Sequence, residues 1–317
     1  MKISVALCTY NGEKYIREQL ESILAQTYKV DEVVISDDCS MDNTIEIIRN
    51  IESRTDIPIY IHRNNTNIGF IRNFEKAVSL CKGDTILLSD QDDIWYPDKV
   101  ESIINWFYEN PDKEVLFTDA DLIDENGEYL KSTLWQTLGF NRKIQEVFDN
   151  GMGYEIFYRD NIATGATMAF RGEIYRTFSS YCKYAFHDEA ICFIALNDDK
   201  LGYCTKKTIK YRIHDSQVCG IGVIGNSQSI CYKAVNKPIS DRLIDLPLSH
   251  RLIERKNFIE YRKKAHTSPF GVFKVIIKWK KFFKMYKKYA FEFMKYDIRQ
   301  NLINITTKMK SIFANKC

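Results

Sequence analysis

The sequence predicts an α/β protein built on a mostly parallel sheet, and three observations lead to this prediction. The chain has 317 residues, of which 45% are hydrophobic, enough for one large α/β domain with an appendage or for two domains. Short apolar runs alternate four times with stretches of helical periodicity, which indicates βαβ units. Polar turns follow three of these runs, and in parallel sheets ligands bind beyond the carboxyl ends of the strands.

The first four strands are expected where short apolar runs are bounded by turn residues, at 3–8, 32–36, 57–62 and 85–88. A helix with one apolar face is expected after each strand, and the second should begin near the capping residues Asp42 and Asn43. The residues expected to face inward are Ile16, Leu20, Ile23 and Leu24, then Ile45, Ile48 and Ile51, then Phe70, Phe74, Ala77, Val78 and Cys81, and finally Val100, Ile103, Ile104 and Phe107.

The pattern changes after the fourth helix. A strand at 115–118 should end in Asp119-Ala120-Asp121, and the turn at 125–127 indicates a hairpin between 122–123 and 129–130. Further strands are expected at 166–170 and 208–213, with a helix that follows Phe186-His187-Asp188-Glu189. Residues 132–160 receive no assignment, and the chain beyond about residue 225 has a helical pattern.

Three carboxylates, Asp90, Asp92 and Asp93, follow the fourth expected strand within four residues. Like charges this close repel one another and raise one another's pKa, so an unpaired cluster is costly at the end of a buried strand. A divalent cation such as Mg²⁺ or Mn²⁺, which prefers oxygen ligands, removes that cost. The alternative is a solvated acidic loop that caps the next helix.

The net charge of +3 conceals a strong asymmetry. Residues 251–317 carry 18 Lys or Arg against 4 Asp or Glu, a net of +14, and the first 250 residues carry a net of −11. Lysines and aromatic residues interleave at 270–289, which is typical of a helix lying at an anionic membrane surface. The alternative is a helix docked on the protein with its lysines in solvent. No RNA-binding motif accompanies the charge, so no nucleic-acid partner is expected.

The cysteines and the apolar runs indicate the cellular compartment in which the protein is expected. The nine cysteines form no C-x-x-C pair, which favours a reducing cytoplasm. The start of the chain is too short for the apolar region of a signal peptide, and no apolar stretch approaches the ~20 residues that span a bilayer. Membrane association is therefore expected to be peripheral, at the inner face of the cell membrane.

A dinucleotide-binding oxidoreductase is not favoured. No glycine-rich loop follows the first strand, and the G-x-G-x-x-G spacing at 220–225 lies late in the chain without a clear βαβ unit around it. A nucleotidyltransferase would need a glycine-rich, basic N-terminal loop, which the sequence lacks.

Four ordered motifs resemble those of the family-two glycosyltransferases. They are Ala6-Leu7-Cys8-Thr9-Tyr10-Asn11-Gly12, Ser36-Asp37-Asp38-Cys39-Ser40-Met41-Asp42-Asn43-Thr44, Leu88-Ser89-Asp90-Gln91-Asp92-Asp93-Ile94-Trp95, and the later pair His187-Asp188 and Tyr211-Arg212-Ile213-His214. The last pair is similar to the bacterial rhamnosyltransferase branch. The resemblance covers about residues 1–225 and implies a GT-A catalytic domain there, with 226–317 as a basic helical appendage.

The resemblance also implies roles for individual residues. Thr9, Tyr10 and Asn11 would line the nucleotide base pocket, where Asp38 would accept a hydrogen bond from a pyrimidine ring. Asp90-Gln91-Asp92 matches the D-x-D motif, in which Asp92 binds the metal and Asp90 faces the ribose or a metal-bound water. His214 would close over the metal or diphosphate, and Asp188 would be the catalytic base or, alternatively, a helix cap. Asn67 and Arg72 are weaker candidates for the donor site.

The expected function is a metal-dependent inverting transfer of a sugar, L-rhamnose from dTDP-rhamnose, to a lipid-linked saccharide in bacterial surface polysaccharide synthesis. The alternative donor is a UDP-hexose, and a non-catalytic membrane adaptor with the same fold is a third interpretation. Relatives often carry aromatic residues after the His-Asp pair, whereas this chain has Glu189-Ala190-Ile191. This departure leaves the acceptor and the donor sugar open.

Overall fold

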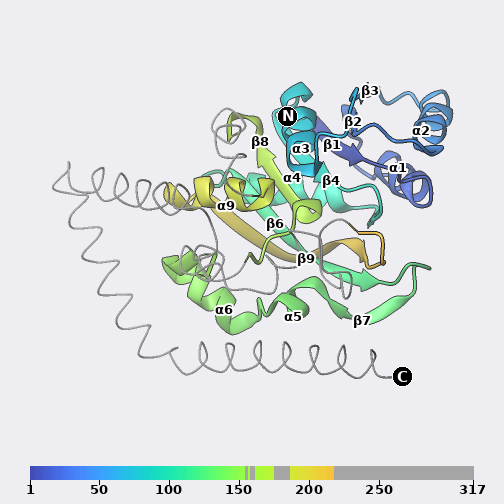
Figure 1. Cartoon of the computed structure of the whole chain (residues 1–317). Coiled ribbons are helices and arrows are strands. Elements are labelled where there is room, and N and C mark those ends of the chain that lie inside the picture. The colour runs from blue at the N-terminus through green and yellow to red at the C-terminus, as the bar shows by residue number, and fades with distance from the viewer. Residues whose placement is uncertain (154–155, 158–160, 175–185, 218–317) are drawn as a thin grey trace, which may run out of the picture. The chain divides into compact units, whose positions relative to one another are not determined.

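The computed structural model describes residues 1–153, 156–157, 161–174 and 186–217 (Figure 1). One compact unit comprises Met1–Thr137 and Ala163–His214. The expected appendage at 226–317, the lysine–aromatic stripes and the G-x-G-x-x-G segment lie outside the described residues. Within the described part of the chain, no helix is long and apolar enough to cross a bilayer.

Nine strands of the described residues form one sheet, in the order β3-β2-β1-β4-β8-β6-β9-β5, with β7 paired to β6. The first half of the sheet is parallel, as the alternating pattern predicts. It consists of β1 (Ile3–Thr9), β2 (Glu32–Asp37), β3 (Ile59–Arg63) and β4 (Thr85–Ser89). Every residue of β1, β2 and β4 is buried, because helices and further strands surround this part of the sheet.

Four helices alternate with these strands: α1 (Ile16–Leu24), α2 (Thr44–Glu52), α3 (Phe70–Leu80) and α4 (Lys99–Glu109). Each buries one face, as the periodicity predicts, and α3 packs against β1 and β2. The inward sets are largely confirmed. Four members of them, at the edges of the buried faces, are only half-buried: Leu24, Ile45, Phe70 and Cys81.

Polar side chains on α1 hold both ends of the acidic turn that follows β4. Gln19 donates to the Ser89 hydroxyl (2.6 Å), and Ser22 accepts from the Trp95 amide (3.0 Å). One turn later, Gln26 accepts from the Val100 amide and donates to the Tyr96 carbonyl (3.0 and 2.8 Å). Helix α1 therefore holds the chain on both sides of residues 90–93.

The second half of the sheet is mixed. It contains β5 (Ile94–Trp95), β6 (Val115–Ile123), β7 (Tyr129–Thr133), β8 (Met168–Arg171) and β9 (Leu201–Arg212). Strand β8 is antiparallel to both β4 and β6, whereas β9 runs parallel to β6. The expected hairpin is confirmed by the antiparallel pairing of β6 with β7, in which Gly127 adopts a positive φ of 88°.

Strand β3 begins two residues later than predicted, at Ile59, and three strands of the second half also differ from the predictions. Strand β6 continues through Asp119, Ala120 and Asp121, because irregularities of register against β9 near Asp119 let the strand bend without ending. Strand β8 begins two residues late, after a 3₁₀ turn at Gly165–Thr167. Strand β9 begins seven residues before the predicted 208–213 strand, because pairing with a neighbour stabilises its more exposed first half.

The unassigned segment at 132–160 contains two short helices, α5 (Leu134–Leu138) and α6 (Arg142–Val147), followed by a single π-helical turn at Phe148–Met152. Asn141 caps α6, because its side chain accepts from the amides of Lys143 and Ile144. Helices of five and six residues have too few turns to show periodicity. The expected helix after Phe186 is present as α9 (His187–Asn197).

The contact between α4 and β9 gives a test of this packing. A Cβ at Gly202 would lie 2.4 Å from the Trp106 ring, so Gly202→Ala should lower the free energy of unfolding by about 1–3 kcal/mol through overpacking. Urea unfolding measures the change. Combining Gly202→Ala with Trp106→Leu, which removes the ring that the new Cβ would meet, should restore part of the lost free energy of unfolding. A fully additive double variant would show that the two residues do not compete for space.

Candidate active site

Three polar turns lie together because the strands that precede them end side by side. Thr9, the last residue of β1, pairs with Asp37 of β2, and Leu7 pairs with Ser89 at the end of β4. The turns at 10–12, 38–40 and 90–93 therefore leave the sheet at the same carboxyl edge, where α/β sheets bind ligands. The convergence expected from the sequence is confirmed.

Gln91 joins the first and third of these turns. Its Oε1 accepts from the Tyr10 amide (2.8 Å), and its Nε2 donates to the Tyr10 carbonyl (3.0 Å). Gly12 leaves room for this contact, since a Cβ there would lie 2.2 Å from Gln91 Oε1. The Gln91 amide, expected at the donor site, is thus used by the protein itself and holds the backbone of Tyr10 in place.

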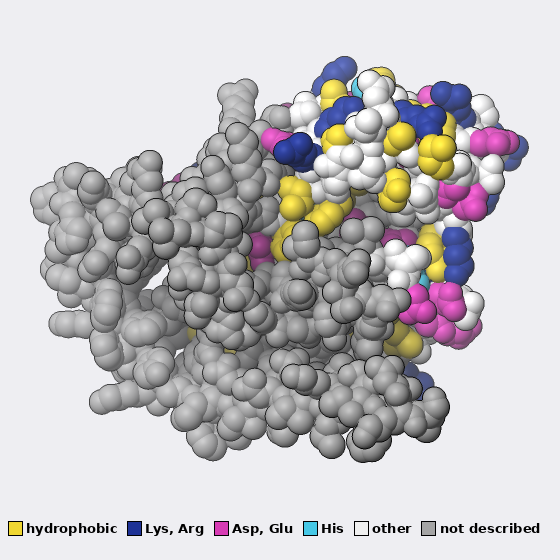
Figure 2. Space-filling view, viewed as in Figure 1, with side chains coloured by type: hydrophobic (Ala, Val, Ile, Leu, Met, Phe, Trp, Pro, Cys, Tyr) yellow, Lys and Arg dark blue, Asp and Glu magenta, His cyan; other side chains and the backbone are white. Residues whose placement is uncertain are grey.

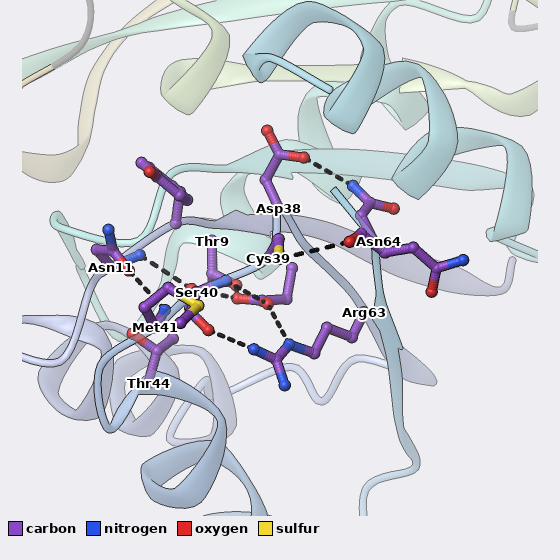
Figure 3. Close-up of polar contacts among 12 residues, drawn as sticks. Thr9, Asn11, Asp38, Cys39, Ser40, Met41, Thr44, Arg63 and Asn64 are labelled. Carbon is purple, nitrogen blue, oxygen red and sulfur yellow. Dashed lines mark hydrogen bonds and ion pairs between the residues drawn. The ribbon is translucent and has the colours of Figure 1, made fainter. Parts of the chain in front are cut away.

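Asp37 organises the second turn (Figure 3). Its carboxylate accepts from the Thr9 hydroxyl (2.9 Å) and the Ser40 amide (3.0 Å), and it lies 3.6 Å from Arg63 Nε. Thr9 is 1% exposed, so its side chain supports this network and does not line an open pocket as predicted. Asn11 has a positive φ of 47° and accepts from the Met41 amide (2.8 Å), which closes the two turns onto each other.

Asp38 points away from this network, toward Asn64 (Figure 3). It accepts three hydrogen bonds, from Asn64 Nδ2 (2.9 Å) and from the amides of Ile68 (2.8 Å) and Gly69 (2.9 Å). A carboxylate has about four acceptor positions, so these three bonds leave one position of Asp38 unused by the described residues, and the residue is 3% exposed. The Asn67 side chain accepts from the Gly69 amide (3.1 Å) beside it, and Arg72 lies exposed in the first turn of α3.

The acidic turn brings three carboxylates to the same edge. Burial, together with the charges of Asp92 and Asp188, raises the pKa of Asp90 to about 7. Burial, together with the charges of Asp92 and Asp90, raises the pKa of Asp93, whose Oδ2 is buried without a hydrogen-bond partner. Asp92 differs from both, because its Oδ2 lies 2.9 Å from His214 Nε2. The predicted cluster is therefore a partly buried site and not a solvated loop.

Arg212, at the end of β9, holds this turn in place. Its backbone amide donates to Asp93 Oδ1 (3.0 Å), and its Nε donates to the Asp92 carbonyl (2.8 Å). The guanidinium also bonds Glu18 (2.6 Å) and lies over the Tyr15 ring, 4.7 Å from its centroid. Arg212 is 2% exposed, and a buried guanidinium needs such partners. It thus connects α1, the acidic turn and the segment that carries His214.

Asp188 reaches the same region from α9. The N-cap position of this helix is Phe186, so Asp188 stands in the first turn, where its Oδ1 accepts from the Glu189 amide (2.8 Å). The alternative in which Asp188 is the N-cap residue of this helix is therefore wrong, because Phe186 occupies that position. The charge of Asp188 contributes to the raised pKa of Asp90, so the two carboxylates are close enough to interact electrostatically.

His187 anchors the first turn of α9. Its ring stacks on Phe74 with centroids 4.2 Å apart, and burial lowers its pKa to about 3, so the imidazole is neutral. A Cβ at Gly165 would lie 2.6 Å from His187 Nε2, which explains why a glycine occupies that position. The packing of His187 fixes the direction in which Asp188 leaves the helix.

The residues present fit a divalent cation at Asp92 and His214. Two neighbouring ligands, each about 2.1 Å from an octahedral ion, are about 3 Å apart, close to the 2.9 Å between Asp92 Oδ2 and His214 Nε2. In the described part of the chain, no three His, Cys, Asp or Glu side chains could hold a metal ion by themselves. The described residues thus offer two ligands here, and Mg²⁺ is commonly held by one or two carboxylates with water and substrate phosphates.

Several residues of this site were not predicted from the sequence. They depend on contacts between distant segments: the hydrogen bonds around Asp37, the contact of Lys99 with Ala166, that of Asn64 with Asp38, and the bonds of Arg212 to the acidic turn. One signal was available. An arginine within an expected buried strand at 208–213 needs a partner, and this indicates a structural or catalytic role.

The described surface offers no simple indication of a partner. On the face seen in Figure 2, basic and acidic side chains both occur, together with scattered hydrophobic ones. A single charge sign does not dominate this face, so the acidic turn and the residues around it remain the part of the described structure with the clearest chemistry.

The sequence profile described as Glycosyl transferase family 2 matches residues 4–175. An uncharacterized glycosyltransferase of Methanocaldococcus jannaschii is 35% identical over 131 residues, which cover 41% of this chain and 45% of that protein. The putative glycosyltransferase EpsE of Bacillus subtilis is 31% identical over 126 residues, 40% of this chain and 45% of EpsE. The chain thus spans about half the length of these curated relatives.

Solved structures share the fold. TarS 1–349 of S. aureus in complex with UDP-GlcNAc superposes with a TM-score of 0.52 at 20% identity, over 68% of this chain and 60% of that chain. The mannosyltransferase PcManGT of Pyrobaculum calidifontis, in complex with GDP-Man and Mn²⁺, has a TM-score of 0.50 at 15% identity, over 78% and 65% of the two chains. The expected GT-A fold is confirmed.

The two hydrogen bonds between the Gln91 side chain and the Tyr10 backbone can be tested by hydrogen exchange. In Gln91→Ala the Tyr10 amide loses its acceptor, so its exchange should accelerate by about 2- to 12-fold, the equivalent of about 0.5–1.5 kcal/mol. The Asn11 amide is the internal control, because it donates to Ser40 and should not change. Equal acceleration at both amides would indicate general loosening and contradict a specific role for Gln91.

Proposed function

The chain belongs to glycosyl transferase family 2, and from this membership we propose that it is an inverting, metal-dependent glycosyltransferase. The reaction moves a sugar from a nucleotide-diphosphate donor to a hydroxyl of an acceptor. One observation carries the proposal: Asp90, Asp92, Asp188 and His214 gather beside the polar turns at the carboxyl edge of the sheet.

In this proposal Asp188 is the catalytic base. Its carboxylate takes the proton of the acceptor hydroxyl while the acceptor oxygen forms a bond to the anomeric carbon of the donor. The bond between that carbon and the diphosphate oxygen breaks on the opposite side, and the nucleoside diphosphate leaves with the electron pair. Because a single displacement occurs, the configuration at the anomeric carbon inverts. The packing of His187 on Phe74 keeps the Asp188 carboxylate in place for this transfer.

Asp92 and His214 would hold the cation, with Asp90 facing the ribose or a water on the ion. When bound, Mg²⁺ or Mn²⁺ neutralises charge that develops on the leaving diphosphate. The choice between these two ions stays open, since carboxylate and phosphate oxygens suit both. Arg212 contributes indirectly by holding the Asp92 backbone.

The base of the nucleotide would bind at the turns after β1 and β2. Asp38, with one acceptor position remaining, would accept the ring N–H of a pyrimidine. Tyr10 is 41% exposed and Asn11 is exposed, so both would be accessible to the nucleotide. Asn67 and Arg72 are both exposed, and Arg72 would approach a diphosphate from solvent.

The donor we propose is dTDP-rhamnose, and the motifs His187-Asp188 and Tyr211-Arg212-Ile213-His214 support it through their likeness to the rhamnosyltransferase branch. A UDP-hexose is the second candidate, because TarS, with the same fold, is complexed with UDP-GlcNAc. Thermal unfolding with UDP-, dTDP- and GDP-sugars and Mn²⁺ separates these candidates by the donor that stabilises the protein most.

The acceptor and the location are proposed from the sequence. The net charge of +14 in residues 251–317 supports binding to an anionic membrane at its cytoplasmic face, and so supports a lipid-linked saccharide as acceptor. Sedimentation of the full chain with anionic and neutral liposomes tests this, and equal sedimentation with both would exclude headgroup attraction.

Removing one cation ligand should strongly weaken metal-dependent nucleotide binding. In Asp92→Asn the carboxylate that lies against His214 is lost, so calorimetry with UDP or dTDP and Mn²⁺ should show at least about a tenfold weaker affinity. Asp98→Asn, an exposed carboxylate paired with Lys206 at the start of α4, is the matched control and should bind as wild type does. Unchanged affinity in Asp92→Asn would remove Asp92 from the cation site.

Removing the base should slow transfer and leave donor binding nearly unchanged. Asp188→Asn keeps a side-chain oxygen that can accept from the Glu189 amide, so the helix start is preserved. Turnover should fall by about two to four orders of magnitude, the usual contribution of a general base. Single-turnover transfer measures the loss, and a thermal melt checks the fold. Turnover within a few-fold of wild type would contradict the base assignment.

A further inference from the structure

Tyr15 is a buried aromatic residue beside the site, and the proposed reaction gives it no role. It is 7% exposed and stands at the N-cap position of α1. Its backbone is held on both sides, because its amide donates to the Gly12 carbonyl (3.0 Å) and its carbonyl accepts from the Gln19 amide (3.2 Å). The side chain of Tyr15 therefore starts from a fixed point next to the turn that follows β1.

The ring of Tyr15 lies against two side chains from the end of β9. Its centroid is 4.8 Å from that of the His214 ring, with the two planes inclined at 44°, and 4.7 Å from the Arg212 guanidinium carbon. Aromatic rings attract each other at centroid separations of about 4.5–7 Å, and cations are attracted to ring faces within about 6 Å. Both contacts are made with the ring, so a phenylalanine would make them as well.

His214 follows the last hydrogen bond of its strand. Strand β9 ends at Arg212, and the Ile213 amide still donates to the Ile123 carbonyl (2.9 Å). Hydrogen bonds of the sheet fix the backbone, but the imidazole can still rotate about its side-chain torsions. A histidine that binds a metal depends on neighbouring groups for its orientation. The Tyr15 ring is such a neighbour, since it packs against a His214 side chain that is only 6% exposed.

We propose that Tyr15 is a positioning residue whose ring holds the His214 imidazole so that its Nε2 stays beside Asp92 Oδ2, at 2.9 Å, before a cation binds. This inference rests on the proposed function, in which Asp92 and His214 hold the cation. Two ligands that are already oriented bind an ion more tightly, because less side-chain freedom is lost on binding. Through Tyr15, the start of α1 thus contributes to the cation site without touching the ion.

Binding of Mn²⁺ alone to the full chain tests this, with the free ion measured by its electron paramagnetic resonance signal. Tyr15→Leu removes the ring, so the affinity for Mn²⁺ should fall by about threefold to tenfold. Tyr15→Phe keeps the ring contact and should bind within about twofold of wild type. Tyr60→Leu is the matched control: the Tyr60 ring also has a lysine ammonium over it (Lys82, 5.4 Å), but it stands on β3, and this variant should bind as wild type does.

A second measurement shows whether His214 still binds the ion. The nitrogen of a bound imidazole modulates the electron spin echo of Mn²⁺, and oxygen ligands do not. Wild type and Tyr15→Phe should show this modulation, His214→Ala should lack it, and Tyr15→Leu should show it at reduced amplitude. Thermal melts show which variants fold. Tyr15→Met, which refills the space without a ring, carries the test if Tyr15→Leu does not fold.

Three results would overturn the role of Tyr15. The first is an unchanged Mn²⁺ affinity in folded Tyr15→Leu, and the second is an equal loss in Tyr15→Phe, which would assign the effect to the hydroxyl. The third is a weaker affinity with full nitrogen modulation, because the effect would then reach Asp92 through Arg212 and not through His214. All three leave the proposed function intact as long as Asp92→Asn strongly weakens the binding of Mn²⁺. Unchanged binding in Asp92→Asn would contradict the cation site itself, and the role of Tyr15 with it.

Discussion

Electrostatic repulsion within the acidic turn is the constraint on which the rest of the site depends. Asp90, Asp92 and Asp93 stand within four residues at the end of a buried strand, and α9 adds Asp188. Burial makes each ionised carboxylate costly, and every neighbouring carboxylate adds to that cost. Arg212 bonds the backbone of the turn, the charge of buried Lys99 opposes the rise in the pKa of Asp90 and Asp93, and the His214 ring lies beside Asp92. The protein thus keeps charge at this edge of the sheet, where a cationic ligand gains most from it.

Two long-range connections make this arrangement possible. Strand β9 lies beside β6 and carries Arg212 and His214 to a turn about 120 residues earlier in the chain. Helix α1 holds the same turn from the other side, through Gln19 and Ser22 and through the ion pair of Glu18 with Arg212. A site held by both a strand and a helix keeps its carboxylates at fixed separations, which a flexible loop cannot do.

The nucleotide side of the site is built differently. Asp37 and Asp38 are neighbours in sequence, yet Asp37 is used entirely by the Thr9, Ser40 and Arg63 network, whereas Asp38 retains one acceptor position. The strand alternation explains this division, because adjacent side chains at the end of a strand point in opposite directions. One carboxylate therefore builds the turn, and the other bonds Asn64 and the amides of Ile68 and Gly69. Gln91, in the acidic turn, bonds the Tyr10 backbone in the turn after β1. These bonds fix the distance between the two turns.

The sequence by itself determined the α/β class, the four alternating units of the first half, the hairpin and the family, because apolar periodicity and ordered motifs are local properties. It also located Asp92, Asp188 and His214, which stand in such motifs and which the fold brings together. It could not show that the Gln91 amide bonds the Tyr10 backbone, that Thr9 is buried on Asp37, or that Lys99 is buried against Trp95 and the Ala166 carbonyl. Nor could it show that β6 passes through Asp119 with irregular register, since that depends on the pairing with β9. Only the tertiary structure decided these, because a hydrogen bond or a charge contact between segments some 30 to 120 residues apart leaves no periodic trace in either segment.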